Sequence, residues 1–174
     1  DWFRTIQDDA DLATSTWGVG TIGQIIKIVA INGNELTLAS PLRMDYDLVR
    51  TPYIRKINMR EQVGIECLKV HRLDATTAQR SNIRFIYAAN CWVNGIESEN
   101  CNFAHVEGRI CSNIDIRKSY MHHGFDYGGG GKAYGVMLHI TANECRVEDN
   151  LFEHLRHSMI VQAGANVMPK SASV

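Results

Sequence analysis

A repeat of about 23 residues is the feature of this sequence that most restricts its fold. Val70, Val93 and Ile116 are evenly spaced along the chain, and Val147 follows Ile116 after one longer interval. A second series shares this period and its one stretched interval: Phe85, Val106, Leu138 and Val161. A fixed period in this range indicates stacked units that bury one continuous core.

The composition of these repeats indicates β-strands rather than helices. Short β-rich segments alternate with polar corners such as Glu99-Asn-Cys101 and Met121-His-His123. No helical period of 3.6 residues persists for more than about one turn, and the fixed leucine positions of a leucine-rich repeat are missing. The sequence therefore predicts an all-β chain, with an N-terminal segment over 1–56 and repeated β-coils over 57–174. The first segment contains a predicted hairpin with strands at 25–31 and 35–40 around Asn32-Gly33-Asn34.

The repeated segments resemble those of the pectate-lyase-like superfamily. The resemblance is carried by residues 91–100 (CWVNGIESEN), 113–120 (NIDIRKSY) and 144–152 (ECRVEDNLF), and by the leading hairpin over 33–42. It implies a right-handed parallel β-helix preceded by an N-terminal hairpin. It also implies a secreted or cell-surface protein active on polysaccharides. The Asp cluster of the pectate-lyase calcium site and the paired Asp motif of polygalacturonases are both missing, which weakens these two specific assignments.

Charge and composition argue against some classes of partner. The chain has 18 basic and 19 acidic side chains and a net charge of −1, so neither nucleic acid nor an anionic membrane surface is expected as a partner. No apolar run reaches the roughly 18–20 residues of a membrane-spanning helix. The five cysteines are expected as buried apolar residues, with one disulfide among Cys91, Cys101 and Cys111 as the alternative in an exported protein.

Alternation along the predicted strands places some side chains on the outside. If Val93 and Ile116 point inward, Trp92 points outward and Arg117 lies in a second outward column. An indole stacks on sugar rings and a guanidinium binds carboxylates, so both residues are predicted to contact substrate. The alternative is an ordinary polar surface with offsetting charges.

The stretched interval contains the predicted functional loop. Residues 121–135 carry the extra length, and they include four consecutive glycines, Gly128 to Gly131. Insertions in repeat proteins project from one face, often the binding face. A phosphate-binding loop is excluded because Lys132 is followed by Ala133.

The histidines around this loop are the candidate catalytic groups. His123 and His154 are separated by the same stretched interval that separates Ile116 from Val147. They are therefore predicted to lie on adjacent coils and to act with Lys132 in acid–base catalysis. No cofactor or metal site is predicted, and a divalent cation near the histidines is the alternative. The remaining predicted substrate-binding residues are Asp126, Tyr127, Arg156 and His157.

Two functions follow from these observations. The first is binding or cleavage of a polysaccharide, with a lyase or hydrolase acting on an acidic glycan as the specific form. The second is a non-catalytic structural, adhesive or filament-forming module. It is motivated by the lack of an amphipathic helix after Gln162, which predicts end-to-end self-association or continuation into a longer chain.

Overall fold

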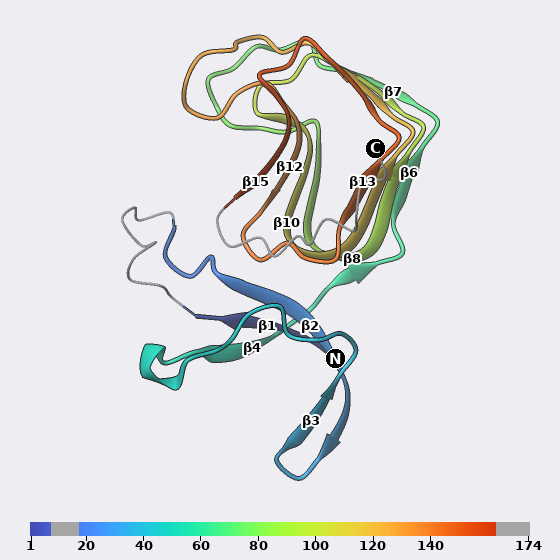
Figure 1. Ribbon diagram of the computed structural model, residues 1–174. Helices are drawn as coiled ribbons and strands as arrows, with labels where there is room; N and C mark the ends of the chain where they lie inside the picture. Colours follow the sequence, from blue (N-terminus) through green and yellow to red (C-terminus); the bar gives the residue numbers. More distant parts are fainter. Residues whose placement is uncertain (8–17, 163–174) are drawn as a thin grey trace.

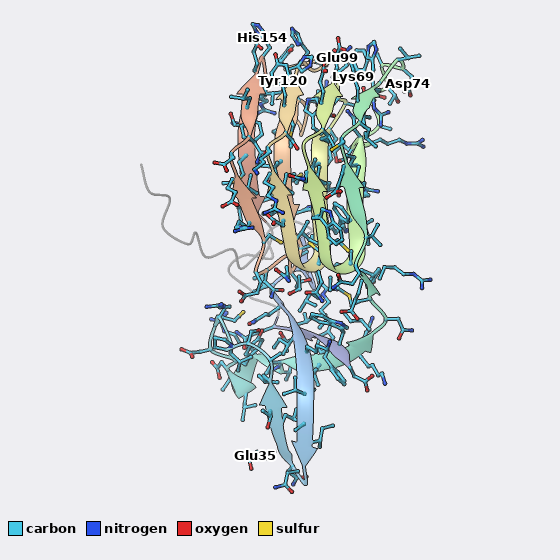
Figure 2. The ribbon with its side chains drawn as sticks, turned by 90° about the vertical axis from the view of Figure 1, so that its right-hand side faces the viewer. Glu35, Lys69, Asp74, Glu99, Tyr120 and His154 are labelled. Atoms are coloured by element: carbon cyan, nitrogen blue, oxygen red, sulfur yellow. The ribbon has the colours of Figure 1, made fainter. Side chains whose placement is uncertain are left out.

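The computed structural model describes residues 1–7 and 18–162, and these form 15 strands in three sheets. The first sheet is antiparallel, with the order β3-β2-β1-β4. Its strands are β1 (Trp2–Ile6), β2 (Gly23–Asn32), β3 (Glu35–Leu38) and β4 (Tyr53–Ile57), and a short 3-10 turn, η2 (Leu48–Arg50), precedes β4. The predicted hairpin is confirmed as β2 and β3. It projects away from the rest of the molecule, with Glu35 near its tip (Figure 2).

The second sheet is parallel and has seven strands. Its main path has the order β15-β12-β10-β8-β5, while β6 pairs with β8 and β13 pairs with β10. The strands are β5 (Arg60–Glu61), β6 (Gly64–Glu66), β8 (Ile83–Asn94), β10 (Ala104–Arg117), β12 (Tyr134–His139), β13 (Arg146–Glu148) and β15 (His157–Gln162). Strands β8 and β10 turn a corner within their length (Figure 1). Left-handed backbone at Tyr87 and Asn90, and at Ile110 and Asn113, produces these bends.

The third sheet is parallel and has four strands, in the order β14-β11-β9-β7. These are β7 (Lys69–His71), β9 (Glu97–Glu99), β11 (Tyr120–His122) and β14 (Leu151–Glu153). Each strand follows a strand of the second sheet after a short turn, so successive chain passes stack in the same order (Figure 1). The third sheet is where most of the candidate site lies.

The main core fills the space enclosed by the two parallel sheets. Val106 and Leu138 line it from one part of the second sheet, Ile116 from the other part, and Met121 from the third sheet; all four are fully buried. Cys91 and Cys111 belong to this core and Cys145 packs against it, as expected for small apolar side chains. Cys101 is also buried, but Cys67 is exposed, contrary to the prediction. All five cysteines are free thiols, so the disulfide alternative is not present.

A buried carboxylate lies on the opposite side of β10. The Glu107 side chain is fully buried and accepts hydrogen bonds from Arg84 Nε at 2.7 Å, Ser81 Oγ at 2.7 Å and His139 Nε2 at 2.9 Å. Burial alone would raise the pKa of Glu107, but these hydrogen bonds outweigh it and lower the pKa to about 2. The ionised carboxylate is therefore satisfied within the fold.

The antiparallel sheet is joined to the parallel sheets by a buried asparagine. The Ile25 N–H donates to Asn143 Oδ1 at 2.8 Å, and Asn143 Nδ2 donates to the Ile25 carbonyl at 3.0 Å. The guanidinium of Arg43 reaches Glu144 Oε1 through both Nε and Nη2, at 2.8 and 2.6 Å. These contacts fix the position of β2 beside the segment that leads into β13.

The predicted fold is wrong beyond its all-β class. What the structure supports is an all-β fold with several sheets, one antiparallel and two parallel, rather than the predicted right-handed parallel β-helix with an N-terminal hairpin. The hairpin belongs to a four-stranded sheet with β1 and β4, which sequence analysis did not find.

The predicted uniform period also fails. Val93 pairs with Ile65 and not with Val70, which pairs with Ser98 in the third sheet. Val106 pairs with Ile83, whereas the repeat predicted Phe85 as its partner. Among the described residues, no helix is long and apolar enough to span a membrane.

Candidate functional site

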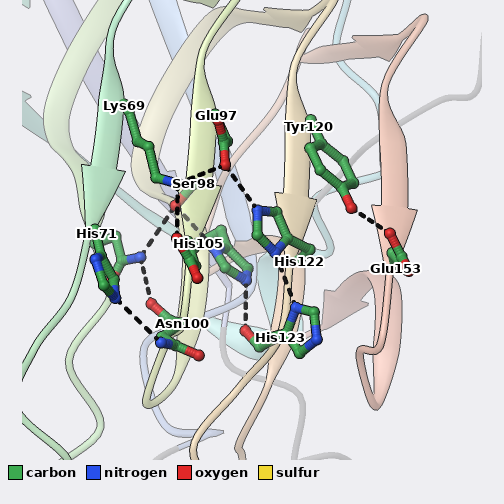
Figure 3. Close-up of polar contacts among 12 residues, drawn as sticks. Lys69, His71, Glu97, Ser98, Asn100, His105, Tyr120, His122, His123 and Glu153 are labelled. Carbon is green, nitrogen blue, oxygen red and sulfur yellow. Dashed lines mark hydrogen bonds and ion pairs between the residues drawn. The ribbon is translucent and has the colours of Figure 1, made fainter.

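The outer face of the third sheet carries most of the candidate site. Val70, Met121 and Phe152 pack into the core, so the residues on either side of them point outward. Strand register aligns these outward residues in two rows across the four strands. The first row is Lys69, Glu97, Tyr120 and Leu151, and the second is His71, Glu99, His122 and Glu153. Figure 3 labels the members of both rows except Leu151 and Glu99.

The turn after each strand adds a third set of side chains. Asn100, His123 and His154 have left-handed backbone, with φ of 57°, 60° and 48°. Asn and His adopt this conformation more readily than most residues. The repeated turn brings the rings of His123 and His154 together, with their centroids 4.8 Å apart and their planes tilted by 38°. The predicted proximity of these two histidines is therefore confirmed.

Lys69 links the two carboxylates of β9. Its Nζ lies 2.8 Å from Glu97 Oε1 and 2.7 Å from Glu99 Oε2. Hydrogen bonds to Glu97 and Glu99 raise the pKa of Lys69, and the same ammonium lowers the pKa of both glutamates. Both carboxylates are therefore ionised near neutral pH.

His122 connects these carboxylates to the neighbouring rings of His123 and His154. Its side chain is mostly buried, its ring stacks on Tyr120 at 4.3 Å between centroids, and its Nε2 lies 3.2 Å from Glu97 Oε1. Its other nitrogen, Nδ1, lies 2.8 Å from Nδ1 of His123. The exposed His123 ring is thus held through a buried ring that itself contacts a carboxylate (Figure 3).

A second carboxylate group closes the site on the β14 side. The Tyr120 hydroxyl donates to Glu153 Oε2, and this hydrogen bond raises the pKa of Tyr120 and lowers the pKa of Glu153. Nε2 of His154 lies 3.2 Å from Glu153 Oε1. Tyr120 therefore retains its proton at neutral pH and Glu153 is ionised.

Buried polar groups support the turn that holds His123. His105 Nε2 lies 3.1 Å from the His123 carbonyl oxygen, and His105 Nδ1 lies 2.8 Å from Ser98 Oγ. Asn82 Nδ2 donates both to Ser98 Oγ at 3.0 Å and to the Asn100 carbonyl at 2.8 Å. Burial lowers the pKa of His105 to about 4, so its ring is neutral at physiological pH.

A shallow groove of about 350 Å³ runs beside the first outward row. Glu97 and Tyr120 form part of its wall, and Lys118 and Asp149 come from the turns that precede β11 and β14. The groove places open space next to the hydrogen-bonded side chains of the outer face.

Three residues of the outer face have donor atoms close enough to share a cation. One atom each from Glu97, Glu99 and His122 lie within 4.8 Å of one another. The Lys69 ammonium already contacts both carboxylates and neutralises part of their charge. A divalent ion would therefore have to displace Lys69.

The predicted site residues of the loop, and Arg156 and His157 at the start of β15, form contacts of their own. Lys132 Nζ pairs with Asp126, and the Tyr127 hydroxyl accepts from the Gly124 N–H at 3.0 Å. Arg156 Nη1 donates to the Gly128 carbonyl at 3.0 Å, and the His157 ring stacks on Tyr134 with centroids 5.4 Å apart. None of these contacts joins the loop residues to His123 or His154.

Trp92 and Arg117 lie on the second sheet. Trp92 Nε1 donates to Glu66 Oε1 at 2.7 Å, and Arg117 pairs in register with Asn94 and Glu148. A turn separates this part of the second sheet from the outer face of the third, so the structure does not bring Trp92 and Arg117 together with the histidines.

Sequence analysis missed most of the residues that contact one another on the outer face. The signal that identifies them is alternation around a buried residue, as in Glu97-Ser-Glu99 and Tyr120-Met-His122. The chain matches no protein-family model, no curated protein and no solved structure. The predicted membership of the pectate-lyase-like superfamily is contradicted by the fold described above, which has several sheets, one antiparallel and two parallel.

Proposed function

We propose that the protein binds a polysaccharide along the outer face of the third sheet and cleaves it by acid–base chemistry. One observation carries this proposal. Close polar or ring contacts link Lys69, Glu97, His122, His123, His154, Glu153 and Tyr120 across four strands, beside an open groove.

The geometry suits a repeating substrate. Neighbouring strands lie roughly 4.8 Å apart, so equivalent side chains recur along a line that crosses the sheet. In the second outward row each step presents a hydrogen-bonding group, from His71 on β7 to Glu153 on β14. A linear polymer can contact the groups on several strands at once, whereas a small solute would contact those on only one strand.

The chemistry suits proton transfer. An imidazole in its neutral form accepts a proton near physiological pH, and a protonated phenol or imidazolium can donate one to a leaving oxygen. The exposed His123 is the proton acceptor in this proposal, and Tyr120 and His154 are the candidate donors. Lys118, in the groove, is placed to contact a substrate carboxylate if the glycan is acidic.

A panel of neutral and uronate-containing polysaccharides tests the proposal. We expect binding to at least one polymer and release of shorter chains, with an ultraviolet-absorbing unsaturated end if the reaction is an elimination. The His123→Ala variant should lose cleavage by roughly 10²-fold or more. Glu35→Gln, at the tip of the distant hairpin, should behave like the wild type (Figure 2). Failure to bind any polymer in the panel contradicts the proposal.

A non-catalytic binding module is the second candidate. It is favoured by Lys69, whose ion pairs to Glu97 and Glu99 occupy both carboxylates as a structural contact would. Binding without any shortened product, and with equal affinity in the His123→Ala variant, would support this second function over catalysis.

A further inference from the structure

We infer that Glu97 and His122 are positioning residues that set the tautomer of His123, so that its exposed Nε2 is the proton acceptor. The use of this proton acceptor rests on the proposed function. The tautomer itself follows from hydrogen bonds within the protein and is tested without a substrate.

The first step concerns the hydrogen bond between Glu97 and His122. An ionised carboxylate only accepts hydrogen bonds, and the Lys69 ammonium keeps Glu97 ionised. The 3.2 Å contact between Glu97 Oε1 and His122 Nε2 is therefore a bond donated by His122. In a neutral imidazole only one nitrogen carries a proton, so Nδ1 of His122 is an acceptor.

The second step concerns the two histidines. Their Nδ1 atoms lie 2.8 Å apart, which is a hydrogen-bond distance that requires one donor and one acceptor. Because His122 is the acceptor, His123 donates from Nδ1. Neutral His123 then has no proton on Nε2, which leaves this exposed nitrogen free to accept one.

The third step concerns the backbone. Burial keeps His105 neutral, and its Nε2–H donates to the His123 carbonyl at 3.1 Å. His105 Nδ1 is then the acceptor for the Ser98 hydroxyl, which in turn accepts from Asn82 Nδ2. Every donor in this buried chain has an acceptor, so the turn at His123 is held in one conformation.

The arrangement also provides a place for the proton. When a substrate C–H or water O–H bond breaks, its electron pair stays on the carbon or oxygen and the proton bonds to His123 Nε2. The Nδ1 proton of His123 can then cross to Nδ1 of His122. His122 becomes an imidazolium beside the Glu97 carboxylate, and His123 is neutral with a proton on Nε2. As His123 gives this proton to a leaving oxygen, the Nδ1 proton returns from His122, so that both rings end neutral in their starting tautomers.

The charged groups around the two rings favour this transfer. Glu97 and Glu99 face them from β9, and Glu153 and His154 face them from β14. Lys69 is the neighbouring cation from β7, and its carboxylate partners Glu97 and Glu99 belong to β9, the strand between β7 and β11. Figure 3 shows Glu97 between Lys69 and His122. Positive charge that arrives on His122 therefore meets a carboxylate directly.

Nitrogen-15 NMR of protein labelled at histidine tests the inference. At about pH 8, where ordinary imidazoles are neutral, we expect His123 in the wild type to carry its proton on Nδ1. Glu97→Leu removes the acceptor for His122, and His123 should then become a mixture of both tautomers. Glu99→Leu is the matched control, because Glu99 shares the contact to Lys69 but makes no hydrogen bond to His122. It should leave His123 unchanged.

A second variant guards against loss of folding. His122→Phe keeps an aromatic ring against Tyr120 and removes both nitrogens, so it should also give mixed tautomers of His123. Wild-type His123 protonated on Nε2, or an unchanged tautomer in both folded variants, overturns the inference. If the tautomer is as expected but no polysaccharide is bound, the proposed function fails and the positioning role stands. If a polymer is cleaved, Glu97→Leu should lower kcat by about 10²-fold with little change in KM.

Discussion

At the scale of single residues, the protein uses two histidines that belong to one hydrogen-bonded cluster but have opposite environments. His123 is exposed on the outer face, whereas His105 is buried beneath it and contacts the carbonyl of His123. Sequence analysis identified His123 and His154 because their spacing equals one stretched interval of the repeat. It did not identify His105, because nothing in a single sequence shows that a histidine is buried and neutral.

The buried His105 predicts a dependence of stability on pH. Its folded pKa of about 4 lies below the ordinary value of 6.5, so between these values the unfolded chain binds more protons than the folded chain. Stability is therefore lost as pH falls from 6.5 to 4, by up to about 3 kcal/mol. Urea unfolding of His105→Gln should show a much smaller loss over this window. His154→Gln, at an exposed ring, should retain the wild-type loss.

The buried Glu107 leads us to expect a separate loss of folding stability at lower pH. Its folded pKa of about 2 lies below the ordinary value of 4.5, so its contribution is present above pH 4.5 and disappears as pH falls toward 2. Glu107→Gln should unfold more easily at pH 7 than the wild type, since Arg84 loses its buried ionic partner. The difference in unfolding free energy between the two proteins should shrink as the pH is lowered to 2. A constant difference across this range would contradict the assignment.

Lys69 predicts a change in metal binding. It neutralises Glu97 and Glu99, whose carboxylate oxygens lie with a His122 nitrogen inside 4.8 Å. The Lys69→Ala variant leaves this donor set without its ammonium, so calorimetry should show tighter binding of a divalent cation such as Zn²⁺ than in the wild type. Lys56→Ala, which removes the ion pair to Asp1 in the antiparallel sheet, should bind no more tightly than the wild type. Equal affinity in Lys69→Ala and the wild type would show that Lys69 does not occupy a cation position.

At the scale of elements, the register of the parallel strands shows which alignments the repeat predicted correctly and which it did not. The alignment of Val93 with Ile116 is the true pairing of β8 and β10, and Ile116 with Val147 is that of β10 and β13. The first repeat was misaligned because β6 is Gly64-Ile65-Glu66, in which a glycine takes the place of an outward side chain. A Cβ at Gly64 would lie 2.3 Å from the Trp92 ring, so Trp92 requires this glycine. The alignment of Val70 with Val93 would place Lys69 beside Trp92, whereas the structure pairs Lys69 with Glu97.

Because elements pack closely around Gly135 in β12, a side chain at this position should lower stability strongly. A Cβ there would lie 2.3 Å from the Ser158 carbonyl oxygen and 2.6 Å from the Phe152 ring. Backbone cannot move aside as a flexible side chain can, so Gly135→Ala should lower the unfolding free energy by about 1–3 kcal/mol. Gly129→Ala is the control, because no atom lies within 4 Å of a Cβ at that position. Thermal or urea unfolding of both variants measures the difference.

At the scale of the whole molecule, a few long-range contacts hold the antiparallel sheet against the parallel sheets. Local alternation predicted the β2–β3 hairpin, which depends on a short turn. It could not predict that β1 pairs with β2 and β4, because these pairings join segments that are far apart along the chain and follow no repeat. The contact between Ile25 and Asn143 spans 118 residues and has no local signal at all.

Asn143 predicts how far the two parts of the molecule depend on each other. Asn143→Ala leaves the Ile25 N–H and C=O without partners in a buried position, which should cost about 2–5 kcal/mol of stability. Hydrogen exchange should increase in β2 before it increases in β10. Asn58→Ala is the control, since Asn58 is exposed and does not have left-handed backbone. Equal effects of the two substitutions would argue against a joining role for Asn143.

The loop between β11 and β12 has a consequence for protein engineering. The chain leaves the third sheet after His122 and re-enters the second at Tyr134, and the strands on either side keep their register with the passes before and after the loop. Loop length is thus independent of strand pairing, and Gly129 borders open space. A short peptide epitope inserted at Gly129 should be displayed on the surface while the sheets fold unchanged, which would make the chain a scaffold for presenting foreign sequences.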